Sequence, residues 1–190
     1  EQVRRLKKHP SIALWCGNNE IHTAWFSWGW KDNFEKQNKD LANKLWNDYD
    51  MLFNKLLAHV VNENDPQRFY WPSSPTSYLG NSFTNTKSGD MHYWDVWHFE
   101  KPFEEYLNNV GRFMSEYGFQ SFPEYRTVES YTLPEERQID SEVMLAHQRH
   151  PRGNQLIKKY TSYYYREPKN FESFLYVGQV LQAEGIRTAI

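Results

Sequence analysis

Short apolar segments that alternate with helical ones limit most strongly what this chain can fold into. Residues 11–16 (SIALWC) form a run long enough for a strand buried on both faces and too short for an ordinary helix. A second short run, residues 68–71, ends at a Pro-Ser-Ser-Pro sequence. Between the two, residues 39–62 repeat apolar side chains at helical spacing. This alternation predicts β/α units, a parallel sheet and helices that lie outside it.

The rest of the chain continues the same pattern. A third strand or its mouth is expected in residues 92–98, and a fourth strand in residues 110–115, with a short helix at 102–108 between them. A loop rich in Ser, Thr, Asn and Gly leads to Gly89. The opening residues read as a helix stopped at His9-Pro10, because a residue before proline resists the α conformation. Further helices are expected near 123–131, 140–150, 153–165 and 170–187.

Polar residues gather where the expected strands end. Glu20 follows the first strand after a Gly-Asn-Asn turn, and Glu116 follows the fourth. The loop at 73–75 and the stretch at 92–98 fall at the same edge. Because the carboxyl ends of parallel strands carry the chemistry in such folds, this edge is the predicted active site.

Composition excludes some classes of function and leaves others open. The formal net charge is −2 and the basic residues are dispersed, which argues against nucleic acid or an anionic membrane as a partner. No apolar run approaches the roughly 20 residues of a membrane span. The chain opens without Met or a signal peptide and reads as part of something longer. Cys16 is alone, so an internal disulfide is excluded and the compartment stays open.

Aromatic residues make up 17% of the chain, with eight Trp. Aromatic faces stack on sugar rings, and they also fill large cores. Composition alone does not choose between these two roles.

Two carboxyl groups at one site suit the hydrolysis of a glycosidic bond. One carboxylic acid protonates the leaving oxygen, and the second carboxylate works from the other side of the sugar. In the retaining variant the second carboxylate attacks the anomeric carbon, and the two groups stand about 5–5.5 Å apart. An isolated glutamate is usually an exposed surface residue, so Glu20 and Glu116 need support from their local sequences.

That support comes from two long motifs. Residues 10–20 (PSIALWCGNNE) resemble the acid/base signature of the glycoside hydrolase family that holds β-galactosidases, β-glucuronidases and β-mannosidases. Residues 113–123 (FMSEYGFQSFP) resemble the nucleophile strand of the β-mannosidase branch. The two motifs stand in the family's order, about a hundred residues apart, and the similarity continues to residues 176–178.

The resemblance implies a role for several residues. Glu20 would be the acid/base and Glu116 the nucleophile of a retaining hydrolase that removes terminal β-D-mannose through a covalent glycosyl-enzyme. Asn19 would hydrogen-bond the sugar 2-hydroxyl, although an Asn here could also be only a turn residue.

Three aromatic residues are further substrate-binding candidates by resemblance. Trp28 and Trp94 match tryptophans that line the family's sugar cleft. His98 stands where some β-mannosidases have a tyrosine that contacts the nucleophile, so its role stays open. For each of them, packing in the core is an equally simple explanation.

The resemblance also predicts what the chain lacks. Residues 1–190 would be a partial catalytic domain, carrying strands four to seven of a (β/α)8 TIM barrel, an α/β fold. The preceding β-sandwich domains, the first three strands and the last strand would be absent. We therefore expect the isolated chain to be inactive or weakly active, and to self-associate through open sheet edges.

Other readings stay open or are weak. The sugar could be that of a β-galactosidase or β-glucuronidase, and a chain of another class, a non-catalytic sugar-binding or structural module, is the second alternative. His147 and His150 have a spacing that some metal sites use, but no carboxylate or Cys accompanies them. Ser73 and Ser74 lack the Gly-x-Ser-x-Gly elbow of a nucleophilic serine. The sequence predicts neither a metal nor a cofactor, and the natural glycan and oligomeric state stay undetermined.

Overall fold

The computed structural model describes residues 1–76 and 86–190 of the chain. Most of the predicted Ser- and Asn-rich loop, residues 77–85, lies outside the described residues. The chain divides into two compact units, which we describe separately. Unit 1 comprises residues 1–92 and 111–116, and unit 2 comprises residues 93–110 and 117–190.

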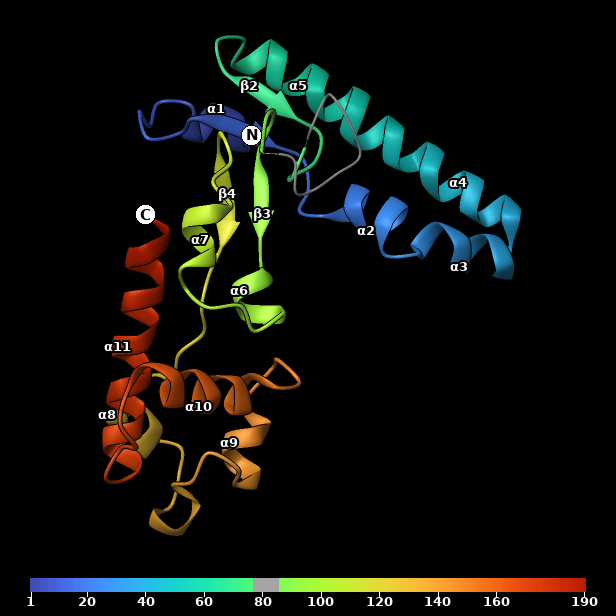
Figure 1. The fold of residues 1–190 in the computed structure, drawn as a ribbon. Coiled ribbons are helices and arrows are strands. Elements are labelled where there is room, and N and C mark those ends of the chain that lie inside the picture. The colour runs from blue at the N-terminus through green and yellow to red at the C-terminus, as the bar shows by residue number, and fades with distance from the viewer. Residues whose placement is uncertain (77–85) are drawn as a thin grey trace. The chain divides into compact units, whose positions relative to one another are not determined.

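Unit 1 combines short strands with a long helical hairpin (Figure 1). Its elements are α1 (Gln2–Leu6), β1 (Leu14–Cys16), α2 (Ile21–Ser27), α3 (Trp30–Gln37), α4 (Lys39–Tyr49), a π-helical segment (Asp50–Leu56), α5 (Leu57–Asn64) and β2 (Phe69–Trp71), together with most of β3 (Met91–Tyr93) and β4 (Met114–Tyr117).

The strands pair in two places. β1 and β2 are parallel, with Trp15 opposite Tyr70, and a parallel bridge between Asn19 and Ser74 continues that pairing. β3 pairs with β4. The parallel pairing that the sequence predicts is therefore present between β1 and β2, and the described residues hold two sheets of two strands.

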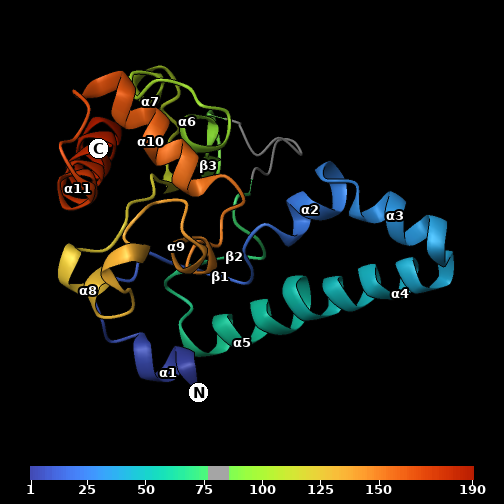
Figure 2. The same ribbon diagram turned by 90° about the horizontal axis from the view of Figure 1, so that it is seen from below.

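The long helix predicted at 39–62 is present, but it is not α-helical throughout. Asn38 caps its start by accepting a hydrogen bond from the Leu41 N–H at 3.0 Å. The π-helical segment joins α4 to α5 without a break in the rod, as Figures 1 and 2 show. Rings from this rod form a stack in which Tyr49 lies 4.9 Å from both Trp46 and Phe53.

The core of unit 1 extends this stack toward α2 and α3. Trp25 of α2 stacks on Trp46 with 5.6 Å between ring centroids, and on Phe34 of α3 with 6.0 Å. Much of the aromatic content therefore serves packing. Trp28 and Trp30 depart from that role, because they remain 51% and 44% exposed.

Unit 2 is mainly helical. Its elements are α6 (Asp95–His98), α7 (Glu105–Asn108), α8 (Tyr125–Glu129), a 3-10 turn (Pro134–Glu136), α9 (Glu142–Ala146), α10 (Gly153–Tyr164) and α11 (Phe171–Ala189). Leu175 and Leu181 of α11 are buried, as are Ile157 and Tyr160 of α10. The two helices pack together at Gly178, where an added Cβ would meet Ile157 at an ordinary 3.5 Å. None of the described helices has the length and apolarity needed to cross a bilayer.

Several predicted boundaries need correction. Helices at 21–37 were not expected from the sequence, and residues 95–98 are helical where a strand or its mouth was expected. Glu116 is the third residue of β4, so it lies within the strand and not beyond its end.

Candidate active site

The first motif builds a rigid turn that carries Glu20. After β1, the Asn18 side chain donates to the Pro72 carbonyl at 2.7 Å and accepts from the Ser73 hydroxyl at 2.9 Å and the Ile21 N–H at 3.1 Å. These bonds tie the turn to the segment that follows β2. Asn18 is thus a structural residue, whose side chain is occupied on both its donor and its acceptor atoms.

Glu20 is held by its backbone on both sides. Its N–H donates to the Ser74 carbonyl at 2.8 Å, and its carbonyl accepts from Ala24 at 2.8 Å as the first bond of α2. Its φ of 59° and ψ of 4° place it in the left-handed region, which is uncommon for a residue with a Cβ. The Glu20 side chain is 21% exposed.

Glu116 enters the same site from β4. Its carboxylate Oε2 lies 3.6 Å from the Nδ1 atom of His92, and its side chain is 32% exposed. The Glu20 Oε1 atom lies 2.6 Å from that same Nδ1. Carboxylate oxygens of the two glutamates and a His92 nitrogen all lie within 4.8 Å of one another. The two predicted carboxylates thus converge on one buried imidazole within unit 1.

His92 and the residues behind it were missed by the sequence reasoning. The His92 Nε2 atom lies 2.9 Å from the Ser74 hydroxyl, which donates to Asp90 in a short hydrogen bond. Asp90 also accepts from the Ser115 hydroxyl at 2.6 Å and from the Thr76 N–H at 2.6 Å. The signal available in the sequence is an Asp-x-His pair at the start of an otherwise apolar strand, a position where a buried polar residue needs partners.

The remaining predicted residues divide between the two units. Asn19 is exposed beside Glu20, and its side chain makes no hydrogen bond to the described part of the chain. Trp28 ends α2 with its ring half-exposed. Trp94 and His98 belong to unit 2, where their rings lie 5.4 Å apart at the two ends of α6.

His98 and His150 form a pair in unit 2. Their rings stack with 5.3 Å between centroids, and the His98 Nδ1 and His150 Nε2 atoms lie 3.3 Å apart. Burial, and then the charge of Arg152, lower the pKa of His150. The His147 ring stacks instead on Tyr131, with 4.0 Å between ring centroids.

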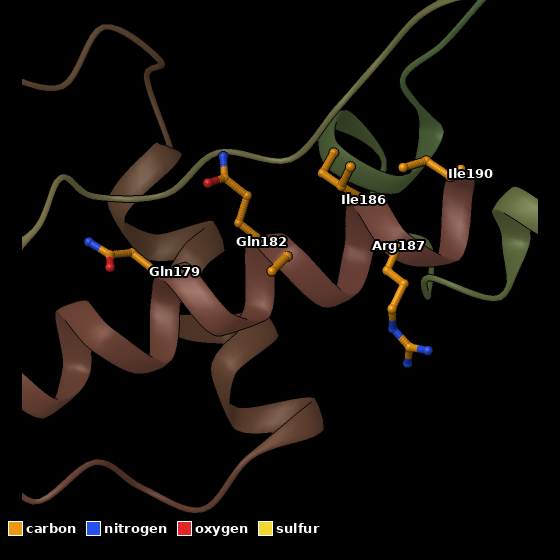
Figure 3. Close-up of a pocket in the computed structure, with 6 residues that line it drawn as sticks. Gln179, Gln182, Ile186, Arg187 and Ile190 are labelled. Carbon is orange, nitrogen blue, oxygen red and sulfur yellow. The ribbon is translucent and has the colours of Figure 1, made fainter.

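Other candidate sites offer less chemistry. Within the described ranges, Glu20, His92 and Glu116 are the one group of three side chains whose donor atoms could reach a single metal ion. Burial raises the pKa of the Cys16 thiol, which disfavours the nucleophilic thiolate. An open hollow along α11 in unit 2, shown in Figure 3, is lined by Gln179, Gln182, Ile186 and their neighbours. Gln182 is already bonded to the Phe119 carbonyl at 2.6 Å, and no carboxylate lines this hollow.

Known proteins match the chain over nearly all its length. β-Mannosidase B of Aspergillus fumigatus is 35% identical over 186 residues, which are 96% of this chain and 22% of the fungal protein. Rat β-mannosidase is 31% identical and is matched by 98% of the chain. The solved β-D-mannosidase of Dictyoglomus thermophilum superposes with a TM-score of 0.79 at 30% identity, over 97% of this chain and 21% of that one.

Over the stretch that it spans, the chain is similar to β-mannosidases in both sequence and structure. This agrees with the branch that the two motifs indicate, although no family model matches the sequence. The chain spans about a fifth of the length of the β-mannosidases it matches. Members of the family named here are glycoside hydrolases, and the two glutamates converge in a stretch that these enzymes share.

Proposed function

We propose that the full-length gene product is a retaining β-mannosidase that removes terminal β-D-mannose from glycosides. The observation that carries the proposal is the approach of Glu20 and Glu116, with carboxylate oxygens within 4.8 Å of each other. This close approach of one oxygen from each carboxylate supports a retaining pair, whose groups stand about 5–5.5 Å apart, over an inverting pair at about 6.5–9.5 Å.

The reaction would proceed in two displacements. Glu116 attacks the anomeric carbon while Glu20 gives a proton to the leaving oxygen, and the glycosidic bond breaks. Glu20 then takes a proton from water, which displaces Glu116 from the sugar and restores both groups. The Glu20 carboxyl group lies 2.6 Å from the Nδ1 atom of His92, a side chain that can exchange a proton with it.

The remaining residues are proposed as substrate contacts. The exposed Asn19 amide would bond the sugar 2-hydroxyl, a contact that strengthens as charge develops at the anomeric carbon. The half-exposed Trp28 ring offers a stacking face. Trp94 and His98 remain candidates by resemblance, and the role of His98 stays open.

We also propose the larger architecture in which these residues would act. Residues 1–190 would form one catalytic domain holding strands four to seven of a (β/α)8 barrel, completed by residues that this chain does not contain. Weak activity and self-association of the isolated chain follow from that arrangement as predictions.

Glu116→Gln tests the nucleophile. We expect kcat on 4-nitrophenyl β-mannoside to fall by about 10⁴-fold or more, the scale found when a catalytic nucleophile is removed. Glu63→Gln is the matched control, since it changes an exposed carboxylate on α5. A Glu116→Gln variant that turns over like the control would contradict the assignment.

Two further measurements separate the alternatives. The anomer first released, followed by NMR, is β for a retaining enzyme and α for an inverting one. Comparing kcat/KM on β-mannoside, β-galactoside and β-glucuronide distinguishes the three branches. Binding of mannose without hydrolysis at any pH would favour the non-catalytic alternative.

A further inference from the structure

A chain of hydrogen bonds lies behind the two carboxylates of unit 1. It runs from Asp90 through the Ser74 hydroxyl to His92, and from His92 to Glu20. Asp90 is 3% exposed and His92 is 4% exposed. Because Asp90 and His92 are shielded from bulk water, their side chains depend on the protein's own donors and acceptors for their hydrogen bonds.

The hydrogens in this chain of bonds can be assigned one by one from Asp90. Its Oδ1 atom accepts from the Thr76 N–H at 2.6 Å, and its Oδ2 atom accepts from the hydroxyls of Ser115 and Ser74. Three donors surround this carboxylate, which suits its ionised, acceptor-only form. The single hydrogen of the Ser74 hydroxyl is therefore committed to Asp90.

The count then fixes one nitrogen of His92. The Ser74 oxygen has no hydrogen left for the Nε2 atom 2.9 Å away, so it can only accept from that nitrogen. Nε2 must carry a hydrogen. In a neutral imidazole the other nitrogen, Nδ1, then has a lone pair and can only accept.

The contact at Nδ1 follows from this. Nδ1 and the Glu20 Oε1 atom are 2.6 Å apart, a separation that requires a proton between them. Either Glu20 is a carboxylic acid that donates to neutral His92, or His92 is an imidazolium that donates to the Glu20 carboxylate. In both forms the pair holds one transferable proton, and Glu116, at 3.6 Å, lies outside hydrogen-bond distance of Nδ1.

We propose that Asp90 and Ser74 hold His92 in its Nε2–H form, so that His92 stores the acid proton with Glu20 and acts as the positioning residue for the acid. The inference rests on the proposed function, in which Glu20 protonates the leaving oxygen. When Glu20 gives up this proton, the glycosidic C–O bond breaks and the pair becomes a carboxylate facing the lone pair of Nδ1. That repulsion drives Glu20 to take a proton from water in the second displacement, which restores the pair.

Two serines provide a matched test, because both hydroxyls donate to the same Asp90 oxygen and only Ser74 is also bonded to His92. Ser74→Ala removes the link to His92, whereas Ser115→Ala removes a donor to Asp90 and leaves the bond between Ser74 and His92 in place. Ser74→Thr keeps the hydroxyl and should restore the wild-type behaviour.

The first readout compares two leaving groups on the full-length gene product. The dinitrophenolate of a dinitrophenyl β-mannoside leaves without being protonated. The sugar leaving group of a β-linked mannose disaccharide must be protonated by the acid. General acid catalysis contributes about 10²–10⁴-fold, so partial loss should raise the ratio of kcat/KM on the dinitrophenyl substrate to that on the disaccharide by about 10-fold or more. We expect this rise for Ser74→Ala and the wild-type ratio for Ser115→Ala. Equal ratios in the two variants would contradict the proposal that Asp90 and Ser74 hold His92 in its Nε2–H form.

The second readout needs no turnover. Nitrogen-15 NMR of labelled histidine should show Nε2 of His92 protonated in the wild type and in Ser115→Ala, and a changed tautomer in Ser74→Ala. An unprotonated Nε2 in the wild type would refute the proposed Nε2–H form of His92, even if the Ser74→Ala variant does not fold. If Glu116→Gln loses turnover but Ser74→Ala and Ser115→Ala give equal kcat/KM ratios, the proposed function stands and the role of Ser74 in holding His92 is refuted. Full turnover in Glu116→Gln would remove the proposed function, and the acid role of Glu20 with it.

Discussion

Adding one methyl group at Gly17 should displace Glu20, the proposed acid, without changing its side chain. Gly17 lies between β1 and Glu20, and a Cβ built there would lie 2.5 Å from the Pro72 carbonyl oxygen and 2.5 Å from the Tyr70 hydroxyl. One of these neighbours is backbone and cannot rotate away. To reach ordinary contact at 3.4 Å, the turn must shift by about 0.9 Å.

Two magnitudes follow for Gly17→Ala. Overpacking of this kind costs about 1–3 kcal/mol of stability, which lowers Tm. A displacement near 1 Å of a catalytic group costs about 10²-fold in rate. Since Glu20 lies three residues further along the same turn, we expect kcat/KM on a β-mannoside to fall by about 10- to 100-fold.

The assay compares Gly17→Ala with Gly178→Ala in the full-length gene product, by thermal unfolding and by kcat/KM. Gly178 lies inside α11, and its added Cβ would meet Ile157 at an ordinary 3.5 Å. Alanine there should leave the rate unchanged and stabilise the helix by up to about 1 kcal/mol. A Gly17→Ala enzyme with the Tm and rate of the wild type would refute the reasoning.

Three further predictions concern charge, metal and packing. The Trp15 indole N–H, followed by neighbouring cations, lowers the pKa of Asp65, so its stabilisation is present above about pH 4 and is lost as pH falls through the lowered value. Urea unfolding should therefore show Asp65→Asn less stable than the wild type at pH 7, with a gap that narrows below pH 4. Zn²⁺ should inhibit β-mannoside hydrolysis competitively by binding His92, Glu20 and Glu116. The inhibition should weaken at low pH, because protons compete with the metal for these side chains. A change in kcat with no change in KM would contradict this prediction. Tyr160→Phe removes a 2.7 Å hydrogen bond that the buried Tyr160 side chain donates to the Lys101 carbonyl, and it should cost about 1–2 kcal/mol in thermal unfolding.

Local patterns explain why part of the fold could be predicted. The apolar run before Glu20 became β1, and the helix expected at 39–62 runs from residue 39 to residue 64. Both signals depend on periodicity and on turn residues within a few positions. The helices at 21–37 lacked such signals, because Glu20 and Gly29 begin them in the left-handed conformation without a side-chain cap.

The site was predictable only where a long motif carried it. Glu20 and Glu116 stood in motifs that resemble a family, and the structure brings them together. No local sequence pattern marked His92 as a site residue more strongly than its neighbours Trp94 and His98. Its partners lie 18 residues away at Ser74 and 72 residues away at Glu20, so the network exists only after the chain has folded.

The left-handed backbone of Glu20 has a consequence for any effort to engineer this protein. A glutamate with φ of 59° carries a penalty of about 1–2 kcal/mol that glycine would not. Replacement by glycine should therefore raise the melting temperature while removing the carboxyl group. A library selected only for thermal tolerance would enrich that substitution, and its fittest members would have lost the acid. Selection here has to score turnover and heat resistance together, because at this position they favour opposite residues.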